Sequence, residues 1–149
     1  MNRFLDCGRL ERTGGDGLEL PEVLTWPGGV IARNYVLNRF YVKNGMINFP
    51  VVIKEAKKDF MCSYNNLRSL EGCPEIVGGS FFCFGNSLTT LKGCPKKVGY
   101  RFDCSDNHLT SLEGCPKEIT ENFICSENPG LFTEEDVRAV CKVGGKIIT

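Results

Sequence analysis

The sequence predicts a repeat solenoid built mostly from short parallel β-strands and loops, with a capping helix near its C-terminal end. Three features predict it: a 21-residue repeat without gaps, alternation of apolar residues inside each repeat, and a helix-capping motif after the last repeat. A unit this short cannot bury a core alone, so neighbouring units must stack. We expect one domain over residues 1–149, with an N-terminal cap and irregular coils in 1–58, regular repeats in 59–128 and a helical cap in 129–149.

The regular repeats share nine columns of similar residues, and a fourth copy opens at Asn122. The three complete copies read DFMCSYNNLRSLEGCPEIVGG, SFFCFGNSLTTLKGCPKKVGY and RFDCSDNHLTSLEGCPKEITE. Phe-x-Cys alternates with period two, so Phe60 and Cys62 are expected to point inward from a very short strand. An inward Asn, such as Asn65, can satisfy free backbone groups where the chain turns. The two Leu columns then fill the core, and a unit of this length leaves room only for extended or 3₁₀ segments on its return side.

Weaker copies of the repeat precede residue 59. Each matches one step of the regular pattern, either the strand or the Pro-x-x-Val step that follows Gly-Cys. The matching steps are Leu18-x-Leu20, Pro27-x-x-Val30, Phe40-x-Val42 and Pro50-x-x-Ile53. We therefore expect two irregular coils ahead of the three regular ones, and we align Ile53 with Val77.

A short helix is predicted after the last repeat. Thr133 and Asp136 form a capping-box pattern, in which an N-cap hydroxyl is followed three residues later by an acid. Val137 and Val140 belong to an apolar stripe that can cover the exposed end of the stack. Residues 146–149 are apolar enough to add an edge strand beyond the helix.

The pattern Phe-x-Cys-x-x-Asn-x-Leu-x-x-Leu resembles the leucine-rich repeat, strongly over residues 59–128 and weakly over 18–58. The Gly-Cys-Pro triplet is similar to short-repeat variants of bacteria and tailed phages. The resemblance implies a right-handed solenoid with a parallel sheet on a concave face that binds other proteins. It also implies a phage-type accessory protein that binds and inhibits a bacterial host or defence factor, as an anti-CRISPR does.

Charge and composition exclude several classes of protein. Eighteen basic and eighteen acidic side chains give a net charge of zero, which argues against binding nucleic acid or a membrane by bulk charge. The apolar runs are too short to span a bilayer, and charge appears too early for a secretory signal. The nine cysteines are an odd number, so we expect reduced thiols and a cytoplasmic protein, in the host cell if a phage encodes it.

The residue types that usually carry chemistry have simpler explanations here. One cysteine column is expected to form a line of buried core thiols about 4.8 Å apart, which is unsuited to tetrahedral metal binding. Its members are Cys62, Cys83, Cys104 and Cys125. Cys7 and Cys141 lie outside the columns and are expected to be the more reactive thiols, whereas His108 fills a variable, solvated position. We expect no catalytic residue, no metal and no cofactor, and hence no enzyme.

The outward positions of the strands are the candidate binding residues. Large apolar side chains gather there although these positions have no core to enter, and clustered exposed aromatics mark interaction surfaces. The predicted partner-binding residues are Met61, Tyr64, Phe82, Phe84, Asp103 and Ile124. The leading prediction is a non-enzymatic module that binds another protein. The alternatives are a structural or assembly protein that self-associates as a homodimer through this face, burial of these side chains under the N-terminal segment, and, least favoured, an enzyme or a direct nucleic-acid binder.

Overall fold

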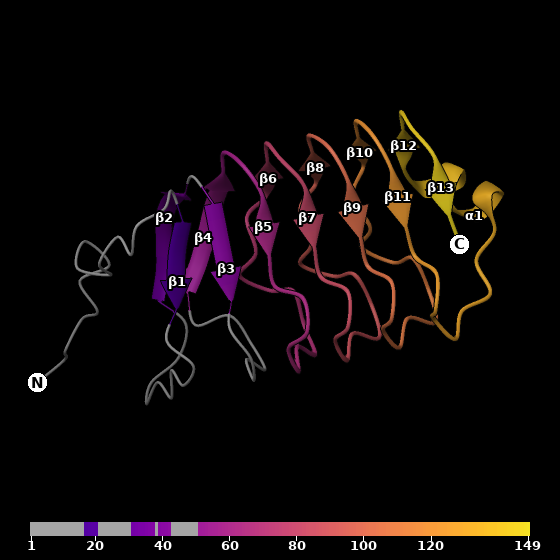
Figure 1. Ribbon diagram of the computed structural model, residues 1–149, viewed down its shortest axis with the longest axis horizontal. Helices are drawn as coiled ribbons and strands as arrows, with labels where there is room; N and C mark the ends of the chain where they lie inside the picture. The colour runs from indigo at the N-terminus through magenta and orange to yellow at the C-terminus, as the bar shows by residue number, and fades with distance from the viewer. Residues whose placement is uncertain (1–16, 21–30, 38, 43–50) are drawn as a thin grey trace, which may run out of the picture.

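The computed structural model describes residues 17–20, 31–37, 39–42 and 51–149, with side chains from residue 55 onward. Among these residues the chain forms a solenoid of two parallel sheets (Figure 1). The seven-stranded sheet has the order β1 (Gly17–Leu20), β3 (Arg39–Val42), β5 (Phe60–Met61), β7 (Phe81–Phe82), β9 (Phe102–Asp103), β11 (Phe123–Ile124) and β13 (Ile147–Ile148). The six-stranded sheet has the order β2 (Ile31–Leu37), β4 (Val51–Ala56), β6 (Ile76–Val77), β8 (Lys97–Val98), β10 (Glu118–Ile119) and β12 (Lys142–Val143).

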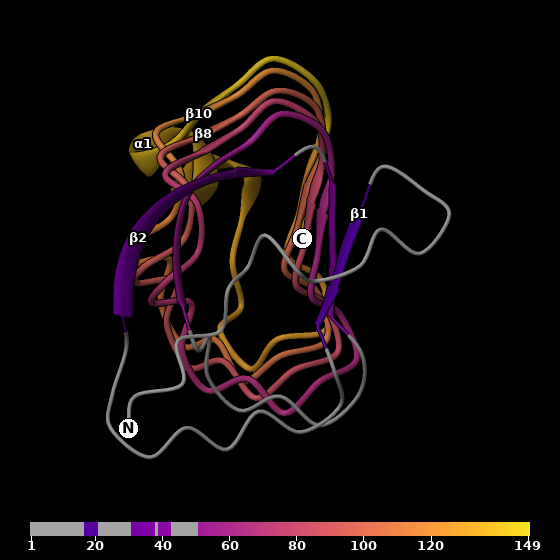
Figure 2. The same ribbon diagram turned by 90° about the vertical axis from the view of Figure 1, so that its left-hand side faces the viewer.

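Each regular coil contributes one two-residue strand to each sheet, so the predicted repeat solenoid is confirmed. The expected extended segment on the return side is the second of these strands. Figure 2 looks along the stack, and the traces of successive coils nearly superimpose. The stack of regular coils therefore bends little. The seven-stranded face, which the resemblance predicted to be concave, is nearly flat.

A column of stacked phenylalanine rings runs through the core. The ring centroids of Phe60 and Phe81 lie 5.3 Å apart, and those of Phe81 and Phe102 lie 5.4 Å apart, with interplanar angles of 6° and 8°. Phe123 continues the column at 5.4 Å with its ring tilted by 32°. All four side chains are fully buried. The strand spacing dictated by parallel hydrogen bonding thus also brings identical rings into contact.

A ladder of buried asparagines ties each coil to the one before it. The Asn86 amide donates to the carbonyl oxygens of Cys62 at 3.0 Å and Cys83 at 2.9 Å, and its Oδ1 accepts the Leu67 N–H at 3.1 Å. Asn107 repeats the arrangement one coil later, with the backbone groups of Cys83, Cys104 and Leu88. The predicted role of the Asn column is confirmed.

The weaker N-terminal copies pair as strands. Phe40 lies in register with Phe60, and Leu18 with Phe40, as the alignment predicts. The alignment of Ile53 with Val77 is wrong, because Ala56 is the register partner of Val77. The six-residue strand β4 is longer than its regular counterparts, so the residue in register with Val77 is three positions later in the chain than predicted, at Ala56 instead of Ile53. Pro27, Val30 and Pro50 lie outside the described residues.

The C-terminal helix α1 (Glu134–Val140) takes the return side of the last coil. Its capping box is present: the Thr133 hydroxyl accepts the Asp136 N–H at 3.2 Å, and the Asp136 carboxylate accepts the Thr133 N–H at 2.8 Å. The Thr133 hydroxyl also donates to the Asp136 carboxylate at 2.7 Å, and this bond together with that from the Thr133 N–H lowers the pKa of Asp136. Val137 is buried, but Val140 is exposed, so only part of the predicted apolar stripe faces the core. The chain then adds β13 at the edge of the seven-stranded sheet, as expected.

The asparagine ladder gives a direct test of the register. Asn86→Ala should lower the free energy of unfolding by about 3 kcal/mol, since it leaves buried donors and acceptors of two coils unpaired. Asn66→Ala should change it by less than about 0.5 kcal/mol, because Asn66 is exposed. Chemical denaturation followed by circular dichroism measures both. Equal small losses would contradict the assigned ladder.

Candidate binding surface

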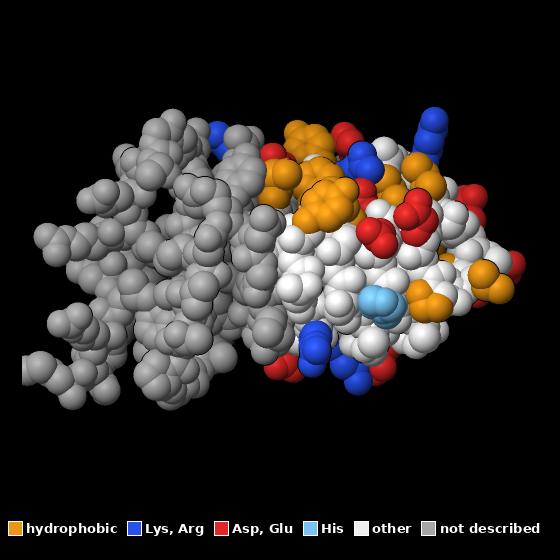
Figure 3. All heavy atoms as spheres, turned by 60° about the horizontal axis from the view of Figure 1, so that its bottom comes forward, with side chains coloured by type: hydrophobic (Ala, Val, Ile, Leu, Met, Phe, Trp, Pro, Cys, Tyr) orange, Lys and Arg blue, Asp and Glu red, His pale blue; other side chains and the backbone are white. Residues whose placement is uncertain are grey.

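Three aromatic rings on the seven-stranded face lie in edge contact with one another. The Tyr64 and Phe84 ring centroids are 5.0 Å apart and those of Phe82 and Phe84 are 6.3 Å apart, both at interplanar angles of 87°. Met61 is the register partner of Phe82 on the neighbouring strand. We call Met61, Tyr64, Phe82 and Phe84 the aromatic cluster. Figure 3 shows hydrophobic side chains gathered on this side of the molecule, followed toward the C-terminal end by acidic ones.

Tyr64 is the most exposed member of the aromatic cluster, and its backbone is strained. Its side chain is 67% exposed, and its φ of 53° lies in the left-handed region, which bulky residues rarely adopt. Gly85 takes the same position one coil later, and a Cβ there would lie 2.7 Å from the Tyr64 ring. The glycine thus leaves space for the ring to lie across the next coil. Such strain persists only where the surrounding structure imposes it, and it often accompanies function.

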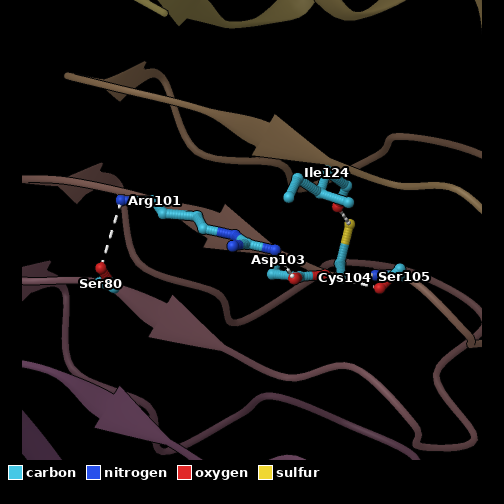
Figure 4. A network of polar contacts seen from close by, with 6 residues as sticks. All are labelled: Ser80, Arg101, Asp103, Cys104, Ser105 and Ile124. Atoms are coloured by element: carbon cyan, nitrogen blue, oxygen red, sulfur yellow. Dashed lines mark hydrogen bonds and ion pairs between the residues drawn. The ribbon is translucent and has the colours of Figure 1, made fainter. Parts of the chain in front are cut away.

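Arg101 extends the cluster along the sheet. Its guanidinium carbon lies 5.8 Å from the Phe82 ring centroid, and Nη2 pairs with the Asp103 carboxylate at 2.8 Å (Figure 4). Ser105 also donates its hydroxyl to that carboxylate at 2.6 Å. Arg101 was not among the predicted binding residues. Its signal in the sequence is the spacing of two from Asp103, which places both side chains on one face of a strand.

Asp103 and Ile124, two of the six predicted binding residues, offer almost no surface to a partner. Asp103 is 4% exposed and Ile124 is 7% exposed. Both point outward as predicted, but neighbouring strands lie only about 4.8 Å apart. Asp103 sits between Phe82 and Ile124 and is closed off by its ion pair, while Ile124 sits between Asp103 and Ile148.

In the later coils, acidic residues occupy the repeat position that Tyr64 occupies in the first regular coil. Asp106 and Glu127 follow Gly85 in this column, with φ values of 49° and 56°. Both side chains are exposed, beside the aromatic cluster rather than within it. The accessible part of this surface therefore combines apolar side chains with acidic side chains on the C-terminal side of them.

The first cysteine column consists of buried free thiols, as predicted. Burial raises the pKa of Cys62, Cys83 and Cys104, and it raises the pKa of Cys125 to about 11. Such thiols remain protonated near neutral pH and are poor nucleophiles. Within the described part of the chain, no three His, Cys, Asp or Glu side chains are placed to hold a metal ion. His108 is exposed, as expected, and Cys7 lies outside the described residues.

The core role of these thiols predicts a distinct mutational pattern. Cys83→Ala should cost about 1–2 kcal/mol of unfolding free energy by opening a small cavity, and Cys83→Ser should cost more because it buries a hydroxyl in an apolar site. Denaturant titration of the two variants measures the order. Elemental analysis of the wild-type protein is the companion measurement, and about one zinc or iron per chain would contradict the core role.

The strain at Tyr64 predicts that its ring is not needed for folding. Tyr64→Asn loses the edge contact with Phe84 but gives the left-handed position a residue that tolerates it. These effects oppose each other, so the unfolding free energy should stay within about 1 kcal/mol of wild type. Thermal unfolding followed by circular dichroism tests this. A much larger loss would mean that the ring is part of the core.

No protein-family model matches the chain, and no curated protein or solved structure matches it. The resemblance to the leucine-rich repeat therefore stays a prediction, while the solenoid itself rests on the strand pairing described above. None of the helices in the described ranges has the length and hydrophobicity needed to cross a lipid bilayer.

Proposed function

We propose that this protein is a non-enzymatic module that binds another protein through the aromatic cluster. The observation that carries the proposal is the exposed Tyr64 ring, held in a strained backbone conformation and in edge contact with Phe84. Aromatic side chains dominate the energetics of protein interfaces, and rigid ones lose little conformational entropy on binding. The cluster is already ordered by its own ring contacts, so binding need not order it.

Charge supports a protein partner over a nucleic acid. Three lysines on the return side of the coil that carries Phe82 and Phe84 are paired with acids, as Lys92–Glu113 at 3.0 Å, Lys96–Glu75 at 3.3 Å and Lys97–Glu118 at 3.4 Å. Arg101 is engaged with Asp103. Single-stranded nucleic acid would require a basic groove beside the aromatic rings. Beyond the paired Arg101, the exposed acids Asp106 and Glu127 lie on the C-terminal side of this cluster, and they favour a partner with an apolar anchor and basic side chains near it.

The biological role that we propose is inhibition of a bacterial host or defence protein in the host cytoplasm. This part rests on the resemblance to small phage repeat proteins and not on the geometry of the surface. A binder of this kind acts by occupying a surface that its target needs. The alternative is that the same rings hold two copies of the chain together. Light scattering distinguishes self-association from binding of another protein, because a monomer at working concentration leaves the aromatic cluster free for a foreign partner.

The aromatic cluster predicts how binding is lost. A tagged chain captures its partner from host extract, and the purified partner is then titrated against variants by calorimetry. Phe82→Ala combined with Phe84→Ala should weaken binding roughly a hundredfold, as loss of aromatic hot spots does. The thermal midpoint should fall by only a few degrees, because both rings are half-buried.

Two control variants separate this surface from others. Leu131→Ala removes an apolar side chain that is almost fully exposed and lies next to α1, and Lys96→Ala with Lys97→Ala removes charge on the six-stranded side. Neither should change the affinity. If the double phenylalanine variant folds and binds as wild type does, the partner uses another surface and the proposal is wrong.

A further inference from the structure

Two cysteines meet where the regular repeats end and the C-terminal helix begins. Cys115 belongs to the last Gly-Cys-Pro triplet, and Cys141 is the C-cap of α1, directly before β12. Strand β12 pairs with β10 so that Lys142 faces Glu118, and the Lys142 N–H donates to the Lys117 carbonyl at 3.0 Å. The pairing brings Cys141 beside the segment that carries Cys115, and both belong to the same buried core cluster.

The two thiols interact with each other, and this contact sets them apart from the other thiols. It raises the pKa of Cys115 and lowers the pKa of Cys141, and the nearby Lys117 lowers the pKa of Cys141 further. The Cys115 sulfur also lies 3.2 Å from the Pro116 carbonyl oxygen. Cys94, the cysteine of the preceding Gly-Cys-Pro triplet, instead donates to the Gly114 carbonyl at 2.9 Å. Among the described cysteines, Cys141 is thus the one whose thiolate is favoured.

Cys141 ends a helix that has few core contacts. Helix α1 has seven residues, of which only Val137 is buried. Elements with little buried apolar surface open locally at low free energy, well before the whole protein unfolds. The Cys141 N–H is bonded to the Val137 carbonyl of this helix at 2.9 Å, so opening of α1 would release the backbone at Cys141 while the asparagine-linked coils before it stay folded.

We propose that Cys115 and Cys141 form a reversible disulfide that fastens α1 to the last regular coil. The oxidant is a small-molecule disulfide. The Cys141 thiolate attacks one of its sulfurs, forms a mixed disulfide and releases one thiolate, which takes up a proton. The Cys115 thiol then loses its proton to solvent, attacks the Cys141 sulfur and releases the second thiolate. Two protein thiols are oxidised, and one small disulfide is reduced to two thiols.

The consequence of the bond is confined to the C-terminal end of the stack. It closes the loop from residue 115 to residue 141, which contains β10, β11 and α1. End units of a solenoid have one neighbour instead of two, so a crosslink there opposes fraying of the end. The aromatic cluster lies on earlier coils, so the bond and the proposed binding function are independent.

The test uses the full chain and oxidised glutathione as the probe. The native protein is incubated with it, free thiols are blocked with iodoacetamide, and trypsin cuts after Lys117, Arg138 and Lys142. Mass spectrometry should find the peptide 139–142 joined to the peptide that holds Cys115, two hydrogens lighter than the separate pair. Fragmentation distinguishes Cys115 from Cys104, which lies in the same peptide. The oxidised protein should melt roughly 5 °C higher, and dithiothreitol should reverse the shift.

Two variants sharpen the result. Cys141→Ser should abolish both the linked peptide and the thermal shift, whereas Cys94→Ser should keep both. A first disulfide between any other pair, glutathione that stays attached to Cys141 without transfer to Cys115, or no reaction under native conditions would each overturn the proposal. The mapping on the wild-type chain needs no variant, so poor folding of a variant does not obscure it.

Discussion

The asparagine ladder is the constraint on which the rest of this structure depends. A strand of two residues satisfies few backbone groups by itself, and the chain must turn out of it inside a dry interior. The Asn86 amide meets this need with bonds to its own coil and to the preceding one. It therefore sets the stacking of the coils, and the phenylalanine rings at 5.3–5.4 Å follow from that stacking. The inward Asn and Phe side chains are needed for this stacking. A binding function must therefore use the outward positions of the coils.

The sequence predicts the inward columns well because inward positions see the same environment in every coil. Phe60, Cys62 and Asn65 are buried as their period and chemistry indicate. The outward positions follow a different rule. Asp103 and Ile124 share a column with Met61 and Phe82, yet they are buried because of which side chains lie on the strands beside them. Outward direction is a property of the repeat, whereas exposure depends on neighbours one coil away.

The aromatic cluster shows the same division between local and neighbour effects. Its rings could be predicted from the apolar residues at outward positions, but the reach of Arg101 to the Phe82 ring could not. Glycine at position 85 signals a position that needs a positive φ, and aligning the repeats places Tyr64, Asp106 and Glu127 in that same position. One backbone conformation thus serves an aromatic ring in one coil and carboxylates in others.

The reactivity expected of each cysteine also depends on whether its neighbours are equivalent coils. Cys83 and Cys104 lie in a column whose every neighbour is a similar coil, and burial is the main cause that raises the pKa of both thiols and keeps them protonated. Cys141 comes after the repeat has been replaced by α1, so its neighbours are Cys115 and Lys117 rather than an equivalent coil. The regular part makes identical side chains inert by giving them identical surroundings. A reactive group in such a fold belongs where the regular sequence of coils stops, and an adaptable binding group belongs where a column varies.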